Sequence, residues 1–296
     1  MSPMKGVRKR KDLRPTGFRI GRYVLPSQVL ISGMMALLYA WILFGGVLYR
    51  DSILLQLLYF ALFLGIIYLL RATQKLYTRL GFAFIVLAIP PLLWNAVTYF
   101  GYGPAIMNLT WVVYISLANL LLGIGLVAAL LYYEKGRPSG IFLQAGNLKA
   151  GLLQGGILLI ASAIIAAAAA YLFYNAGSAE TSPLFPVFGA LLVFAIACGF
   201  VEELWFRGLL LSRLLPLVST TPAIIIQAFA FAAYEAVFLY MLTSNPVYSL
   251  AVFVVAVVLG AVWAWMAARD KSIIAPALSH AGIYLILALP VFAAFF

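Results

Sequence analysis

The sequence predicts an all-α polytopic membrane protein, a bundle of about nine transmembrane helices. Hydrophobic residues make up 66% of its 296 residues and charged residues only 9%, whereas soluble domains carry about 25% charged residues. The mean hydropathy is +1.09. Long apolar runs recur along the chain, and basic residues gather in alternate connectors. These observations exclude a soluble globular domain, and no connector is long enough to fold alone.

The scarcity of two residue types limits the possible chemistry. The chain has one cysteine, Cys198, and one histidine, His280. A single cysteine excludes an intrachain disulfide and a cysteine-based zinc cluster. The net charge of +11 would suggest nucleic acid in a soluble protein, but the basic residues flank apolar runs here. We therefore expect membrane lipid as a partner and no nucleic acid.

Residues 1–23 form a basic arm, in which eight Lys or Arg residues accompany a single acidic residue, Asp12. We expect this arm in the cytoplasm, against anionic lipid headgroups. The apolar run from Val24 to Leu48 is too long for a signal-peptide core and has no small-residue cleavage site. It is therefore predicted as a retained first helix.

Eight further apolar runs complete the predicted bundle. They cover residues 53–70, 80–100, 109–133, 151–174, 184–206, 222–242, 247–268 and 272–295. Pro90-Pro91 interrupt the third helix, and such a pair is compatible with a kink or with a re-entrant segment. The total falls from nine helices to eight if this region is re-entrant.

The basic residues predict the orientation of the bundle. Counting the arm, 18 of the 19 Lys and Arg residues fall in segments on one side, and Arg50 falls on the other. Cytoplasmic loops carry an excess of Lys and Arg. We therefore expect a multi-pass protein of the cell membrane with a cytoplasmic N-terminus.

A loop signal divides the chain at Gly136-Arg137-Pro138-Ser139-Gly140. The predicted helices before this loop contain no ionisable residue within an apolar run, whereas the helices after it contain all such residues. The predicted parts are a basic cytoplasmic arm (1–23), an N-terminal four-helix membrane region (24–135), a cytoplasmic linker (136–150) and a five-helix core with the candidate site (151–296).

Ionisable residues within apolar runs mark the candidate site, because a charge in the hydrocarbon region is costly. Glu202 and Glu203 are adjacent near the end of the sixth run, and Arg207 follows them. On a helix Glu203 and Arg207 share a face, while Glu202 points about 100° away. Arg207 can neutralise Glu203 and leave Glu202 for a water, a proton or an ion. Alternatively, both acids only pair with basic groups and lock the bundle.

Glu235 and His280 are the other ionisable residues within apolar runs. Glu235 lies about 20 Å into its helix, so it can meet Glu202 and His280 in a cavity open to the cytoplasm, with Glu235 at the floor. The alternatives are a protonated Glu235 bonded to a backbone carbonyl and a histidine that only packs. Cys198, one turn before Glu202, is interpreted as a small packing residue in preference to a nucleophile.

Four sequence blocks follow one another in the C-terminal half. The blocks are Glu202-Glu203-x-x-x-Arg207-Gly208, Phe231-Ala-Ala-Tyr-Glu235, Leu259-Gly260 and Ser272-Ile-Ile-Ala-Pro276-x-x-x-His280. In order and spacing they resemble the CPBP family of intramembrane proteases, which comprises the CAAX prenyl protease 2 and bacteriocin-processing (Abi-type) proteins. The resemblance covers about residues 185–290 and gives no information on the first 130.

The resemblance implies a role for each of the matching polar residues. Glu202 would be the general base that activates water, with Glu203 and Arg207 as its support. His280 would bind the oxyanion or the water. These roles describe an intramembrane protease that uses a glutamate as its base.

Two positions depart from the family pattern. Glu235 stands where the family has a histidine, and Tyr284 stands where it has an asparagine. The Tyr284 hydroxyl can still donate a hydrogen bond to an oxyanion, but the extra carboxylate calls for a proton or a cation. Glu202, Glu235 and His280 form an oxygen-rich ligand set with one imidazole, which suits a divalent metal such as Zn, Mn or Mg.

Two classes of function follow from these departures. The favoured one is an intramembrane endopeptidase that hydrolyses a peptide bond of a membrane-associated or prenylated substrate, with a glutamate-activated water and with or without a metal. The other is a catalytically inactive membrane scaffold or a ligand- or ion-binding protein with a protease fold. An ion-coupled transporter that uses the buried acids is a third alternative.

Overall fold

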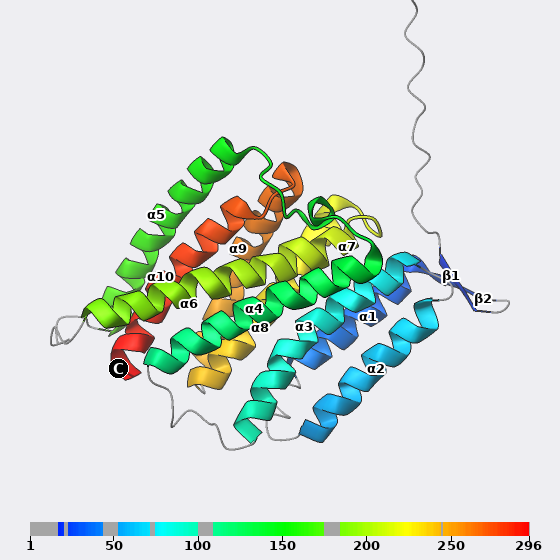
Figure 1. Ribbon diagram of the computed structural model, residues 1–296, viewed down its shortest axis with the longest axis horizontal. Coiled ribbons are helices and arrows are strands. Elements are labelled where there is room, and N and C mark those ends of the chain that lie inside the picture. The colour runs from blue at the N-terminus through cyan, green and yellow to red at the C-terminus, as the bar shows by residue number, and fades with distance from the viewer. Residues whose placement is uncertain are drawn as a thin grey trace, which may run out of the picture.

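The computed structural model describes residues 17–20, 23–43, 53–71, 75–99, 109–174, 184–243 and 245–295. Nine long helices make up most of this part of the chain and pack into a bundle (Figure 1). They are α1 (Ser27–Leu43), α2 (Ile53–Arg71), α3 (Lys75–Tyr99), α4 (Leu109–Glu134), α5 (Leu148–Tyr174), α6 (Leu184–Glu203), α8 (Thr220–Thr243), α9 (Pro246–Asp270) and α10 (Ile274–Phe295). Each of them overlaps one of the predicted apolar runs.

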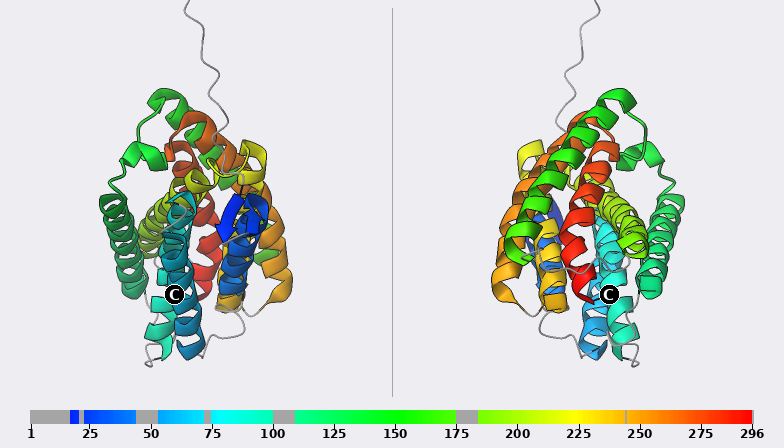
Figure 2. Two further views of the ribbon diagram at one scale, coloured as in Figure 1. Left: turned by 90° about the vertical axis from the view of Figure 1, so that its right-hand side faces the viewer. Right: turned by 90° about the vertical axis from the view of Figure 1, so that its left-hand side faces the viewer.

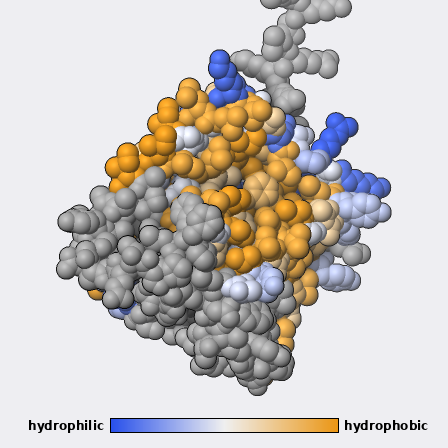
Figure 3. All heavy atoms as spheres, turned by 60° about the vertical axis from the view of Figure 1, so that its left-hand side comes forward, coloured by the Kyte–Doolittle hydropathy of each residue, from blue (hydrophilic) through white to orange (hydrophobic). Residues whose placement is uncertain are grey.

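The length and surface of these helices are those of a membrane protein. Within the described ranges, four helical segments are long and apolar enough to cross a membrane, namely Val112–Glu134, Gly189–Leu214, Thr220–Tyr240 and Pro246–Asp270. Large apolar side chains such as Leu121 and Val258 are exposed on their outer faces. On the face drawn in Figure 3, apolar residues cover most of the described surface and hydrophilic residues gather at its margins. The number of crossings and the cytoplasmic N-terminus remain predictions.

A short β-hairpin precedes α1 in a described chain that is otherwise helical, as the all-α prediction expects. β1 (Gly17–Ile20) pairs antiparallel with β2 (Tyr23–Pro26), and α1 begins only at Ser27. The run is apolar from Val24 onward and therefore predicts a helix that begins at that residue. Pro26 explains the difference, because a proline favours an extended conformation for the residue before it.

Helix α3 continues through Pro90-Pro91. A proline removes one backbone donor and favours a kink, but a helix can still pass through it when its neighbours support it. The described backbone therefore favours a single long helix here over the re-entrant alternative.

Helix α6 occupies the centre of the C-terminal half. It packs against α4 and α10, while α8 pairs with α9, and α5 lies along the outside of α10 (Figure 2). Small residues allow the central contacts to be close. A Cβ added at Gly199 of α6 would lie 3.0 Å from the backbone nitrogen of Ala281 in α10, and one added at Gly123 of α4 would collide with Val201. These contacts bring the end of α6 against the middle of α10.

The connector between α4 and α5 packs over one end of this core. It contains a 3₁₀ turn, η3 (Pro138–Ile141), and Ile141 is completely buried. The Ser272 hydroxyl donates a hydrogen bond of 2.8 Å to the Gln144 carbonyl. The predicted linker is therefore tied to the turn between α9 and α10 (Figure 1).

Candidate active site

The candidate site begins where α6 passes into a π-helix. The π-helix η5 (Leu204–Leu211) follows α6 directly and leads into the short α7 (Ser212–Leu214). All eight residues of η5 are buried, and π-helical turns are frequent at functional sites. The apolar run predicts a regular α-helix through Arg207 instead. A π-turn depends on packing from all sides, which a local sequence pattern does not encode.

Glu203 and Arg207 form the predicted ion pair. Arg207 Nη1 lies 2.8 Å from Glu203 Oε1, and both side chains are completely buried. The guanidinium carbon lies 4.2 Å from the ring centroid of Phe231 and 5.1 Å from that of Trp263. Because an arginine stays charged in a protein, Glu203 is its counter-ion, and the two aromatic faces add cation–π attraction.

His280 connects Glu203 to Glu202. Its Nδ1 lies 3.0 Å from Glu203 Oε1, and its Nε2 lies 3.5 Å from Glu202 Oε2. Because Glu203 is the counter-ion of the guanidinium, it accepts a hydrogen bond from Nδ1–H, and Nε2 is left to face Glu202. The imidazole stacks on Trp263 at 4.6 Å between ring centroids. The indole is fixed in turn by a 3.0 Å hydrogen bond from its Nε1 to Ser279 Oγ.

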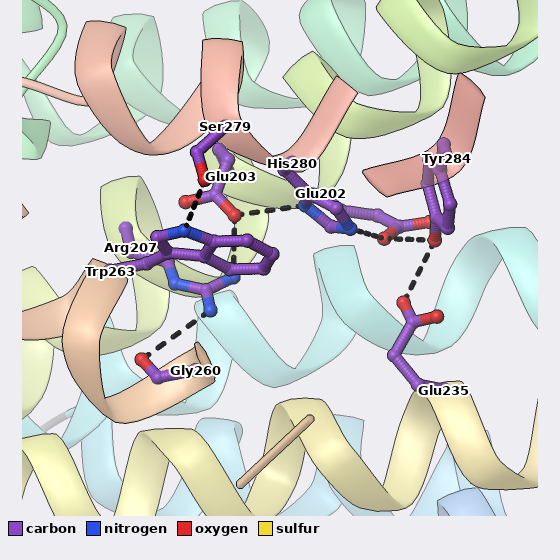
Figure 4. Close-up of polar contacts among 9 residues, drawn as sticks. All are labelled: Glu202, Glu203, Arg207, Glu235, Gly260, Trp263, Ser279, His280 and Tyr284. Carbon is purple, nitrogen blue, oxygen red and sulfur yellow. Dashed lines mark hydrogen bonds and ion pairs between the residues drawn. The ribbon is translucent and has the colours of Figure 1, made fainter. Parts of the chain in front are cut away.

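Tyr284 bridges Glu202 and Glu235. Its hydroxyl oxygen lies 2.7 Å from Glu202 Oε2 and 2.9 Å from Glu235 Oε1 (Figure 4). A phenol has one proton to donate, so it can donate to only one of the two carboxylates. The other contact becomes a hydrogen bond when that carboxyl group is protonated and donates to the phenol oxygen. The arrangement can therefore hold one proton between the two acids.

The two departures from the family pattern therefore contact each other. Glu235 replaces a basic group with an acid, and Tyr284 supplies a hydroxyl that this acid can bond. A carboxyl group buried without a hydrogen-bond partner would be strongly unfavourable. The second departure compensates for the first.

The structure joins all six predicted side chains into one continuous series of contacts. In order, the series runs Arg207, Glu203, His280, Glu202, Tyr284, Glu235 (Figure 4). The exposed fraction rises from 0% at Arg207 to 8% at Glu235 and 9% at Tyr284. All six side chains are buried, so the predicted cavity open to the cytoplasm stays a prediction.

Sequence reasoning missed polar residues that lie beside this series. Ser116 and Asn119 on α4 lie near the Cys198 thiol. Cys198 also belongs to the same buried cluster as Tyr284. The sequence signal for this region was the asparagine inside an apolar run, because burying its amide group in lipid costs free energy, as burying a charge does. Trp263, which orients the histidine, has no comparable signal in the sequence.

Three of these residues fit a divalent metal ion. Glu202, Glu235 and His280 each offer one ligand atom, and these atoms lie within 4.8 Å of one another. Zinc binds such atoms at about 2.0–2.2 Å, which separates ligands in a tetrahedral site by about 3.3 Å. The 3.5 Å between His280 Nε2 and Glu202 Oε2 agrees with that spacing. The contact of Nδ1 with Glu203 is the outer hydrogen bond that metal-binding histidines usually make.

Residues 183–286 match the family model described as type II CAAX prenyl endopeptidase Rce1-like. This match covers about a third of the chain, and over that segment the sequence is similar to the Rce1-like family. The match runs from the start of α6 into α10 and confirms the resemblance to CPBP proteases. Because the matching family consists of endopeptidases, it supports a membrane protease as the class of this protein. Neither a curated protein nor a solved structure matches the chain. Helices α1 to α5 lie outside the Rce1-like segment.

Proposed function

We propose that this protein is an intramembrane endopeptidase that hydrolyses a peptide bond of a membrane-associated or prenylated substrate. The observation that carries the proposal is the position of Glu202, whose carboxylate lies 2.7 Å from the Tyr284 hydroxyl and 3.5 Å from His280 Nε2. Peptide hydrolysis needs a base for the attacking water and donors for the oxyanion. The contact series in the Rce1-like segment offers both.

Glu202 acts as the general base. It takes one proton from a water whose oxygen forms a bond to the scissile carbonyl carbon, and negative charge develops on the carbonyl oxygen. Tyr284 donates a hydrogen bond to that oxygen, and His280 Nε2 accepts one from the attacking water. Glu203, held by Arg207, accepts from Nδ1–H and orients the imidazole, as a buried carboxylate does in serine proteases.

The proton held between Glu202 and Glu235 supplies the acid. Glu235 in its protonated form gives a proton to the amine as the carbon–nitrogen bond breaks. Aspartic proteases also keep one carboxyl group ionised and its partner protonated, because two adjacent like charges do not both ionise. The glutamate at position 235 is compatible with hydrolysis for this reason.

A divalent cation offers a second version of the same chemistry. Zn, Mn or Mg bound by Glu202, Glu235 and His280 would act as a Lewis acid toward water or the carbonyl. The cation and the shared proton exclude each other, because metal ligation requires both carboxylates in the ionised form. The ligand spacing supports this alternative.

The first test is cleavage of a fluorogenic farnesylated peptide that ends in a CAAX sequence. Purified protein in nanodiscs is expected to cleave the peptide. The shared-proton version predicts unchanged kcat after treatment with EDTA or 1,10-phenanthroline, because no ion is needed. The metal version predicts loss of kcat and its recovery when Zn, Mn or Mg is restored. Binding without turnover would favour the scaffold or ligand-binding alternative, and ion-dependent uptake by vesicles would favour the transporter.

Tyr284→Phe tests the bridging hydroxyl. The change keeps the aromatic ring but removes the group that lies between Glu202 and Glu235. Loss of an oxyanion donor typically lowers kcat by about 10²–10³, and we expect a decrease of that size with a small change in KM. Phe194→Leu, which alters a ring that packs against Tyr284, is the packing control. An unchanged kcat for Tyr284→Phe would exclude the hydroxyl from the mechanism.

A further inference from the structure

Asn119 is a polar residue beside the site to which the proposed mechanism gives no role. It lies on α4, outside the Rce1-like segment, and three leucines follow it directly. An amide inside an apolar transmembrane run is unfavourable without partners, and such residues usually face the interior of a bundle. Its position therefore calls for an explanation.

Helix α4 runs alongside the last turns of α6. Val112 packs against Leu191, and a Cβ at Gly123 would approach Trp205 to 3.2 Å. The two contacts follow each other in the same direction along both helices, so α4 and α6 are parallel. Asn119 lies between these contacts and therefore beside the part of α6 that leads to the site.

Asn119 shares one face of α4 with Val112 and Gly123, at spacings of seven and four residues, and this face packs on α6. Ser116, on the same face, already donates to the Val112 carbonyl at 2.7 Å. An amide has two donor hydrogens and two acceptor lone pairs, and Asn119 is only half-buried. Its hydrogen-bonding capacity therefore faces α6 near Cys198.

We propose that Asn119 binds the backbone of the substrate peptide, and this inference rests on the proposed function. Cys198 precedes Glu202 by one helical turn, about 6 Å along the axis. An extended peptide advances about 3.3 Å per residue, so Asn119 contacts the substrate about two residues from the scissile bond.

The chemistry of an amide suits this role. A substrate segment opened for hydrolysis inside a bilayer exposes backbone N–H and C=O groups that need hydrogen-bond partners there. A carboxamide can donate to the carbonyl and accept from the N–H of such a segment. Helix α4 thus supplies a wall of the binding site that the Rce1-like segment lacks.

The test compares Asn119→Ala with Ser116→Ala. The probe is the fluorogenic farnesylated CAAX peptide, measured for cleavage and, on a Glu202→Gln background, for binding. Loss of one neutral hydrogen bond predicts a rise of about 3- to 10-fold in KM and Kd for Asn119→Ala, with kcat nearly unchanged. Ser116→Ala, whose hydroxyl is used within its own helix, is expected to match the wild type.

Peptides in which one backbone amide at a time is replaced by an ester locate the contact. In the wild type, one ester about two residues from the scissile bond is expected to raise Kd by the same factor, and the Asn119→Ala variant should be insensitive to that ester. Equal responses of wild type and variant to every ester would overturn the role of Asn119.

The outcomes separate this inference from the proposed function. Cleavage with identical KM for wild type and Asn119→Ala overturns the role of Asn119 and leaves the endopeptidase intact. Binding without cleavage, weakened by Asn119→Ala, overturns the endopeptidase and supports the contact. A wild type that neither binds nor cleaves the peptide overturns both.

Discussion

Glu202→Gln is expected to lower kcat by about 10³-fold, within the range reported for general-base catalysis. Glutamine keeps the volume of the side chain and can still accept the hydrogen bond from the Tyr284 hydroxyl at 2.7 Å. It cannot take a proton from water. The loss should therefore appear in kcat, while the affinity for the farnesylated peptide and the thermal unfolding midpoint stay close to those of the wild type.

Glu134→Gln is the matched control for this variant. Glu134 is also an acid with little exposure, but it lies at the end of α4 and pairs with Arg213 at 2.5 Å, away from the contact series. We expect Glu134→Gln to lower the unfolding midpoint and to retain kcat. An active Glu202→Gln variant would exclude a glutamate-activated water at this position and would leave the non-proteolytic alternatives.

The positions of the helices could be predicted from the sequence because they depend on local composition. A helix in lipid satisfies its own backbone and needs only a long apolar run, so nine runs were enough to locate the nine long helices of the described chain. The hairpin was not predicted because local composition was also the basis for placing the start of the first helix. The residues from Val24 onward are apolar enough for a helix, and only Pro26 marks the change.

The candidate site could be predicted as a set of residues but not as an arrangement. The cost of a buried charge identified Glu202, Glu235 and His280, and helical spacing identified the pair of Glu203 with Arg207. Which carboxylate meets which hydroxyl depends on how α6, α8 and α10 pack, and no local pattern encodes that. The position of the Tyr284 hydroxyl between Glu202 and Glu235 therefore became apparent only in the structure.

Attention to ionisable residues alone also hid the contribution of α4. Ser116 and Asn119 are neutral, so they did not stand out against five more strongly marked side chains on other helices. Their position beside the site depends on the parallel packing of α4 on α6, through contacts such as that of Gly123 with Trp205. A search for any polar side chain within an apolar run would have included them.

Arg207→Met is expected to cause the largest loss of stability. Arg207 and Glu203 are completely buried and 2.8 Å apart, so the change leaves a buried carboxylate without its counter-ion. Removing one partner of a buried ion pair typically costs about 3–5 kcal/mol. The free energy of unfolding, measured by denaturant titration in mixed micelles, should fall by that amount.

The double variant Glu203→Gln/Arg207→Met shows whether the orphaned charge causes this loss. Replacing both partners removes the isolated charge, and buried pairs replaced by neutral groups of similar size are often close to neutral in stability. We therefore expect the double variant to recover most of the loss. Arg269→Met is the exposed control, because Arg269 has 38% of its side chain exposed and pairs with Asp270. Its effect should stay within about 1 kcal/mol. A double variant no more stable than Arg207→Met would instead assign the loss to the packing of the arginine between Phe231 and Trp263.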